Sequence, residues 1–293
     1  MQVNARKIKL LKLDVYTAID NQIEQGFILI ELLIAIFIST SLLNLVMKIY
    51  LTSEKVLQNQ TTLMQIQSNA HETISILNNE IKKAGHIGCA KLTSEFSPIP
   101  FRNYSLNIKN KLMGNDNEIT IRYADYPSAI LVKNMNNKKN LSVNRNIKFT
   151  SGDILLISNC KWAEIFQVAK VKISRDTQEI TSTSPLTHDF DSNSEISHFI
   201  INHYFINKTN RTHRDGSFVY ALFLESNHQY KNELVADITH MSLKYSLYQQ
   251  GILMDKFASQ ITDWSSVKGV AIELKLGSSQ LKKSWYGYAS LSQ

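Results

Sequence analysis

The sequence predicts an α+β protein in which a long N-terminal helix, membrane-spanning in its first half, packs against an antiparallel β-sheet domain. Three observations predict this fold. Residues 27–47 are almost uniformly apolar, and no proline lies between Phe27 and Ser97. Past residue 100, apolar residues instead alternate with polar ones at every second position, which is typical of half-buried antiparallel strands.

The first half of the helix is expected to cross a membrane. Glu31 is the only charged residue between Phe27 and Met47. At about 1.5 Å per residue, a helix of this length spans a hydrocarbon core of roughly 30 Å. The polar segment before it carries four basic residues, Arg6, Lys7, Lys9 and Lys12. The positive-inside tendency therefore places residues 1–26 in the cytoplasm and the chain beyond residue 50 outside.

The candidate cleavage site precedes the apolar segment. An ordinary secretory signal is cut after its apolar region, which is then lost. A cut between Gly26 and Phe27 would instead remove the basic leader and keep the helix. Hydropathy alone favours the simpler alternative of a single-pass anchor with an isolated carboxylate. A carboxylate near a bilayer costs a few kcal/mol, however, so Glu31 is expected to have a partner.

The helix is expected to continue as an amphipathic segment over residues 51–85. Neither proline nor glycine interrupts it before Gly85, which follows two lysines and is a plausible C-cap. Apolar residues recur in steps of three and four and form one stripe: Leu63, Ile66, Ala70, Ile74, Leu77, Ile81 and Ala84. The alternative is a short coiled coil, which the lack of ordered flanking charges disfavours.

The remaining residues, 86–293, are expected to form one β-rich domain. Three runs alternate clearly, at 119–123, 241–247 and 270–276. Four more read as strands, at 153–158, 162–173, 196–206 and 217–225, and are separated by turn-forming polar residues. We find no internal repeat and no flexible linker.

Composition and motifs do not indicate an enzyme. The net charge of +7 comes from scattered residues, so specific nucleic-acid binding is not expected. The chain has no phosphate-binding glycine loop, nucleophile elbow or zinc motif. His198 and His203 are five residues apart on an expected strand and so face opposite ways. No catalytic residue, metal or cofactor is therefore expected.

The N-terminal region resembles a known signal. The run Gly26-Phe27-Ile28-Leu29-Ile30-Glu31-Leu32-Leu33 is similar to the class III signal of type IV prepilins and pseudopilins. This resemblance implies cleavage between Gly26 and Phe27 by prepilin peptidase and N-methylation of Phe27. It also implies that Glu31, at the fifth mature position, pairs with the N-terminal amine of a neighbouring subunit. Ile28 departs from the small hydroxyl residue that many members have there.

Three further segments resemble PilW-type minor pilins. Residues 68–89 end in Ala-Gly-His-Ile-Gly-Cys, similar to the family's Ala-Gly-aromatic-x-Gly-Cys pattern with His86 in the aromatic position. Residues 152–168 and 233–267, the latter including Asp263-Trp264, are also similar. The implied layout is type IV pilin-like, with a cleaved leader at 1–26, a membrane and filament-core helix at 27–50, an amphipathic helix at 51–85 and a periplasmic domain at 86–293.

The resemblance implies a minor pilin that helps to initiate or cap type IV pilus assembly and supports adhesion, twitching motility or DNA uptake. Its implied partners are prepilin peptidase, other minor pilins, the major pilin, the inner-membrane assembly platform and a tip adhesin. The implied location is the bacterial inner membrane, with the C-terminal domain periplasmic, and then the pilus base or tip. Two alternatives remain, a GspJ-like minor pseudopilin of a type II secretion system and a membrane-anchored periplasmic enzyme or receptor.

The resemblance also gives the two cysteines a context. In a periplasmic domain, Cys89 and Cys160 can oxidise to a disulfide that ties the end of the helix to a strand. Closing a loop of about 70 residues stabilises a fold by up to roughly 4 kcal/mol in the chain-entropy description. The alternative is two buried free thiols.

Overall fold

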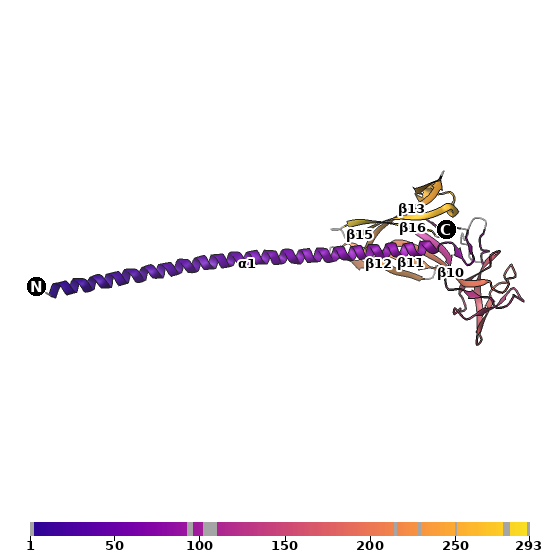
Figure 1. The fold of residues 1–293 in the computed structure, drawn as a ribbon, viewed down its shortest axis with the longest axis horizontal. Coiled ribbons are helices and arrows are strands. Elements are labelled where there is room, and N and C mark those ends of the chain that lie inside the picture. The colour runs from indigo at the N-terminus through magenta and orange to yellow at the C-terminus, as the bar shows by residue number, and fades with distance from the viewer. Residues whose placement is uncertain are drawn as a thin grey trace. The chain divides into compact units, whose positions relative to one another are not determined.

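The computed structural model describes residues 3–92, 96–101, 110–213, 216–227, 230–249, 251–277 and 282–291, with side chains from Ile28 onward. A long helix, α1 (Val3–Lys83), is followed by antiparallel sheets, so the chain is an α+β protein (Figure 1). It divides into two compact units, Met1–Met64 and Gln65–Gln293. Each unit is described by itself below.

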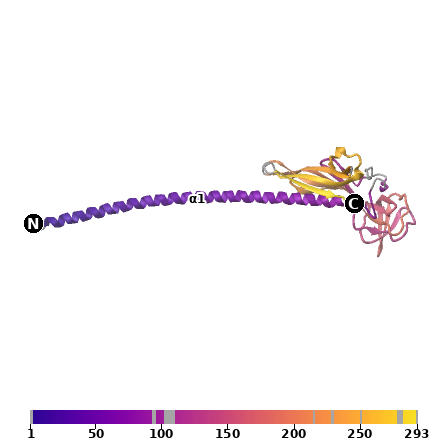
Figure 2. The ribbon, with the colours of Figure 1, turned by 45° about the horizontal axis from the view of Figure 1, so that its top comes forward.

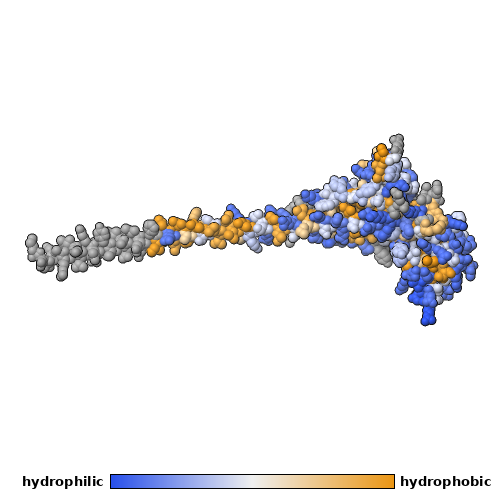
Figure 3. Space-filling model, viewed as in Figure 1, coloured by the Kyte–Doolittle hydropathy of each residue, from blue (hydrophilic) through white to orange (hydrophobic). Residues whose placement is uncertain are grey.

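In the N-terminal unit, α1 is bare of any packing partner. Every described residue from Ile28 to Met64 is exposed. The large apolar side chains between Ile28 and Met47 have exposed fractions of 51–71%. Figure 3 shows them as an orange band along the helix. By length and composition this helix is long and apolar enough to cross a membrane.

Two polar side chains within the apolar segment bond to carbonyl groups of the helix itself. Thr40 Oγ1 donates to the carbonyl of Phe37 at 3.0 Å, and Asn44 Nδ2 donates to the carbonyl of Thr40 at 2.8 Å. Such local bonds lower the cost of placing a polar group in hydrocarbon.

In the C-terminal unit, the last turns of α1 bury one face. Ile66, Ala70, Leu77, Ile81 and Ala84 are buried, as the stripe predicted. Two members of the predicted stripe differ, since Ile74 is only half-buried and Leu63 is exposed. The hydroxyl residue Thr73 is buried as well, and its Oγ1 donates to the carbonyl of Asn69. Gly85 follows with a φ of +81°, which confirms its predicted place just past the helix end.

Two larger sheets and one small hairpin make up the β structure of this unit. The hairpin is β1 (His86–Ile87) with β2 (Ala90–Lys91). The smaller sheet has the order β14-β13-β15-β16, and Figures 1 and 2 show its yellow strands beside the last turns of α1. Its strands are β13 (Ile238–Gln249), β14 (Ile252–Lys256), β15 (Val267–Gly277) and β16 (Lys282–Ser290). Two short 3₁₀ turns, η1 (Ala258–Gln260) and η2 (Trp264–Ser266), connect β14 to β15.

The ten-stranded sheet is organised around the long strand β10 (Glu195–Thr212), which pairs with β4, β5, β7 and β11. Its main path runs β12-β11-β10-β7-β8-β9-β6, and β3 pairs with β4 beside it. The other strands are β3 (Leu112–Gly114), β4 (Glu118–Ala124), β5 (Ala129–Ile130), β6 (Asn140–Asn144), β7 (Ile154–Ser158), β8 (Ala163–Ile173), β9 (Thr177–Ser182), β11 (Phe218–Ser226) and β12 (Tyr230–Ala236). All named pairings are antiparallel.

Three hydrophobic clusters fill this unit. The first joins the buried stripe of α1 to strands of both larger sheets, including β4, β13 and β15. The second lies among β6, β7, β8 and β9, which Figure 2 shows in pink beyond the end of α1. The third lies between Ile87 after the helix and the inner residues of β7, β8 and β10.

A half-buried carboxylate fastens the helix to the sheet. Glu80, on the last turns of α1, accepts hydrogen bonds from Tyr123 Oη of β4 at 3.0 Å and from Asn202 Nδ2 of β10 at 2.9 Å. Lys83 Nζ lies 2.8 Å from its other oxygen. Burial opposes ionisation, but the hydrogen bonds from Lys83, Asn202 and Tyr123 and the charge of Lys83 together hold the pKa of Glu80 below its usual value.

Glu80→Gln is expected to lower the free energy of unfolding by about 1–3 kcal/mol at pH 7, because the ion pair with Lys83 is lost and the bonds from Tyr123 and Asn202 no longer go to a charged acceptor. A lowered carboxyl pKa stabilises the fold above the unfolded pKa, and that stability is lost as the pH falls through the folded pKa. The difference between wild type and variant should therefore shrink below about pH 4.5, the usual value for this group. Urea denaturation across pH measures it.

Glu72→Gln is the matched control, because Glu72 is exposed on the same helix. It should change stability by less than about 0.5 kcal/mol at either pH. A Glu80→Gln effect that stays constant from pH 7 to pH 3 would contradict the assignment of a stabilising ionised carboxylate.

Candidate processing and assembly site

The predicted cleavage junction lies inside α1. The backbone is helical on both sides of Gly26–Phe27. The side chains of these two residues lie outside the described residues, so cleavage and methylation there stay predictions. The exposed apolar segment begins directly after the junction, at Ile28.

Glu31 is an exposed carboxylate without a counter-charge. Among the described residues it makes no hydrogen bond and no ion pair, and apolar residues flank it on both sides. The next basic residue along the helix is Lys48. At 1.5 Å per residue, Lys48 lies about 25 Å away along the axis, too far to neutralise it. A cation for Glu31 therefore has to come from another molecule or from residues outside the described part.

The structure brings the two cysteines together. Cys89 lies in the two-residue turn between β1 and β2, and Cys160 lies in the turn between β7 and β8. Both are free, as in the alternative of two free thiols, but they are exposed and not buried. The two cysteines line the same cavity of about 330 Å³. Their oxidation to a disulfide stays a prediction.

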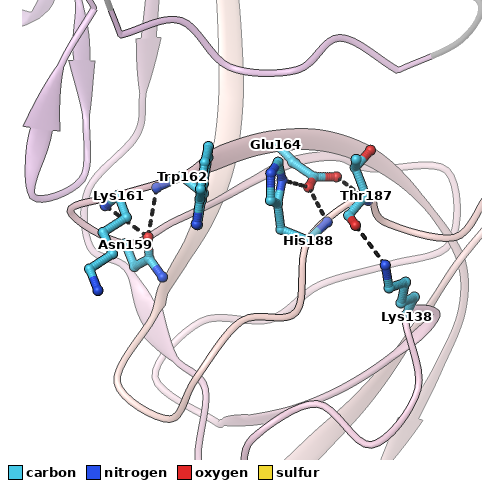
Figure 4. Close-up of polar contacts among 7 residues, drawn as sticks. All are labelled: Lys138, Asn159, Lys161, Trp162, Glu164, Thr187 and His188. Atoms are coloured by element: carbon cyan, nitrogen blue, oxygen red, sulfur yellow. Dashed lines mark hydrogen bonds and ion pairs between the residues drawn. The ribbon is translucent and has the colours of Figure 1, made fainter.

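A buried carboxylate holds a loop against β8. Glu164 of β8 is 3% exposed. Its Oε2 accepts from the backbone N–H of Thr187 at 2.7 Å, and its Oε1 accepts from the backbone N–H of His188 at 2.6 Å. His188 Nδ1 also lies 2.6 Å from Oε1 (Figure 4). These contacts satisfy a charge that would otherwise be costly to bury.

The ring of His188 is held on its other side by an aromatic residue. It stacks on Trp162 with ring centroids 4.1 Å apart (Figure 4). Trp162 ends a turn in which Asn159 Oδ1 accepts from the backbone N–H groups of Lys161 and Trp162. Lys138 Nζ donates to the carbonyl of Thr187 from the far side of the loop. The pair Glu164–His188 has the arrangement of a base and its orienting carboxylate, but no described hydroxyl or thiol hydrogen-bonds to the ring.

Two further histidines, His198 and His203, lie on β10 and have separate partners. His198 Nε2 lies 3.2 Å from Asp153 Oδ2, and His203 Nε2 lies 3.3 Å from Glu118 Oε2. The two histidines therefore lie against different carboxylates. Over the described part of the chain, no group of three or more His, Cys, Asp or Glu side chains is placed to hold a metal.

Neither Glu80 nor Glu164 was predicted from the sequence. The sequence did contain a signal for Glu164, because this charged residue has apolar neighbours, Ala163, Ile165 and Phe166. The structure shows that all four of these residues are buried at the start of β8. A charged residue in such a run requires partners. For Glu80 the signal was weaker, since charged residues on an amphipathic helix are usually solvated.

Comparison with known proteins provides no independent identification. No protein-family model, curated protein or solved structure matches the chain.

Glu164→Ala is expected to lower the free energy of unfolding by about 3 kcal/mol, because two backbone N–H groups and His188 lose their acceptor together. His188→Ala should cost only about 1 kcal/mol, since both backbone bonds to Glu164 remain. Chemical denaturation of each variant and of the double variant measures the effects. A larger loss for His188→Ala than for Glu164→Ala would contradict this description of the cluster.

Proposed function

We propose that this protein is a minor pilin of the type IV class, closest to the PilW-type family, that is processed by prepilin peptidase and helps to initiate or cap pilus assembly. The observation that carries the proposal is the combination of Gly26, Phe27 and Glu31 at the head of a helix that is exposed and apolar for the next five turns.

The exposed apolar side chains of the helix support the proposal that it lies in an environment other than water. Fully burying one large apolar side chain is worth about 1.5–3 kcal/mol. The segment from Ile28 to Met47 exposes more than half of each of its large apolar residues, so something must cover them. A bilayer can do so before assembly, and the equivalent helices of other subunits can do so in a filament. Both environments require the helix to be apolar around its whole circumference.

The isolation of Glu31 supports the assembly step. A lone carboxylate in an apolar segment destabilises that segment in lipid unless a cation neutralises it. Cleavage at Gly26 would create a new amine at the same depth in each neighbouring subunit. Pairing between the two charges is then available only to a subunit in the correct register. This pairing would explain why a charge is tolerated at that position.

Residues of the PilW-like segments have defined structural roles in the C-terminal unit. Asp263 Oδ1 accepts from the backbone N–H of Ser265 and caps η2. Trp264 packs edge-on against Tyr245 of β13, with ring centroids 4.8 Å apart. The Gly88-Cys89 pair forms the turn of the β1–β2 hairpin. Under this proposal, the C-terminal unit lies on the periplasmic side. Its partners are other minor pilins, the major pilin, the assembly platform and a tip adhesin.

Glu31→Ala tests the proposal in cells that carry a type IV pilus system and lack their own copy of this subunit. The variant should enter the membrane as wild type does, because the substitution makes the helix more apolar. Its recovery in sheared pilus fractions should fall at least about tenfold, since about 1.4 kcal/mol of lost pairing suffices for that. Quantitative immunoblotting of membrane and pilus fractions measures both.

Two matched variants sharpen the result. Glu31→Asp keeps the charge and should retain part of the incorporation, whereas Glu31→Gln keeps the shape and should behave as Glu31→Ala does. Glu54→Ala, on the polar part of the same exposed helix, should assemble normally. Equal pilus incorporation of wild type and Glu31→Ala would count against the proposed role.

A further inference from the structure

We propose that Cys89 and Cys160 form a thiol–disulfide exchange site, in which Cys160 reacts first with an incoming disulfide and Cys89 then closes an intramolecular bond. Oxidation would fasten the turn that follows α1 to the turn between β7 and β8. This inference depends on the placement of the two turns and not on the proposed function.

The β1–β2 turn is shaped to approach β7 closely. Gly88 has a φ of +81°, which L side chains rarely adopt. A Cβ at this position would collide with the Ser158 hydroxyl and lie 3.2 Å from Glu195 Oε2. Only glycine therefore lets the turn lie against the end of β7, and this contact brings Cys89 beside Cys160.

The turn that carries Cys160 is equally well fixed. The backbone N–H of Asn159 donates to the carbonyl of Trp162 at 2.9 Å, which closes the turn. Asn159 Nδ2 reaches Asp191 Oδ1 at 3.2 Å and ties the turn to the loop before β10. Two turns held by independent contacts thus place the only two cysteines of the sequence next to each other, 71 positions apart.

Both sulphurs are accessible to a reagent. Cys89 and Cys160 are exposed and line the same cavity of about 330 Å³. Lys161, Asp191 and Glu195 also line this cavity. A disulfide substrate can therefore reach either sulphur without unfolding of the protein.

The surroundings of Cys89 make it the second thiol to react. Partial burial, the hydrogen bond and the charge of Cys160, and the charge of Glu195 raise the pKa of Cys89 to about 11. At neutral pH almost none of Cys89 is thiolate, and the thiolate is the form that attacks a disulfide. The first attack is therefore assigned to Cys160.

The reaction balances as two exchanges. The Cys160 thiolate attacks one sulphur of an oxidised thiol compound, such as glutathione disulfide, whose S–S bond breaks and releases one thiolate that takes up a proton. Cys89 then gives up its proton and attacks Cys160 in the mixed disulfide, releasing the second thiolate, which is protonated in turn. The protein loses two electrons and two protons, and one glutathione disulfide becomes two glutathione thiols.

The bond is tested on the full-length chain in detergent, equilibrated with reduced and oxidised glutathione and then alkylated. Tryptic digestion separates the cysteines, because Cys89 falls in peptide 84–91 and Cys160 in peptide 149–161. We expect a disulfide-linked pair of these peptides. Its equilibrium constant should fall roughly a thousandfold in denaturing urea, where the chain-entropy cost of closing the loop returns.

The order of attack is tested with two variants. Cys89→Ser should accumulate glutathione on peptide 149–161, since the resolving thiol is missing. Cys160→Ser should be modified at Cys89 about threefold more slowly at pH 7.5 than Cys89→Ser is modified at Cys160, because partial burial and the charge of Glu195 still raise the pKa of Cys89 after Cys160 is replaced. In urea the two variants should react at similar rates.

Each result can overturn the inference. An equilibrium constant that is the same within threefold in native buffer and in urea would show that the fold does not bring the thiols together. Bridging only between two molecules would do the same. Faster modification of Cys89 in Cys160→Ser than of Cys160 in Cys89→Ser would reverse the assigned order.

Discussion

The burial of one face of α1 from Ile66 to Ala84 is the interaction on which the rest of the C-terminal unit depends. These residues belong to the largest cluster, together with inner residues of both larger sheets. Without them, β4, β13 and β15 would expose the apolar faces that alternate along each strand. Glu80 adds direction to this packing, because its bonds to Tyr123 and Asn202 fix how far along the sheet the helix lies.

The same helix changes character within one turn of Ile66. Before that point every described residue is exposed, although the segment from Ile28 to Met47 is the most apolar part of the chain. One helix therefore needs two environments, a protein core for its last turns and an apolar medium for its first described turns. This requirement limits the functions that fit the chain more strongly than its fold class does, because the exposed segment needs an apolar environment.

The elements with a clear local signal could be predicted from the sequence. The absence of proline and glycine after Phe27 predicted that the helix continues to about Gly85, and period-two alternation predicted β4, β13 and β15, but the start of α1 at Val3, ahead of Gly26, was not predicted. The pairing order of the strands could not be predicted. β4 pairs with β10 across some seventy residues, and the alternation of apolar residues along a strand does not indicate which strand it pairs with. The exposed strands β14 and β16, at the two edges of the smaller sheet, lack a buried face in the sequence pattern and were missed.

The candidate sites divide in the same way. Gly26, Phe27 and Glu31 are contiguous, so the sequence suffices to single them out, and the structure adds the isolation of Glu31. The partners of Glu80 on the sheet are distant in sequence, with Asn202 lying 122 positions further along the chain, and no local pattern indicates them. The contact of Cys89 with Cys160 likewise depends on Gly88 and on the turn held by Asn159, which only the folded chain places together.

The identity of the mature N-terminus tests the central claim most directly. The full chain is produced with and without an active prepilin peptidase, a known prepilin serving as substrate control, and its intact mass and N-terminal peptide are determined. Our account predicts that the peptidase removes residues 1–26 and that the product begins at Phe27 with one added methyl group. An unchanged N-terminus while the control prepilin is cleaved, or a cut after residue 40 or so that discards the helix, would contradict it.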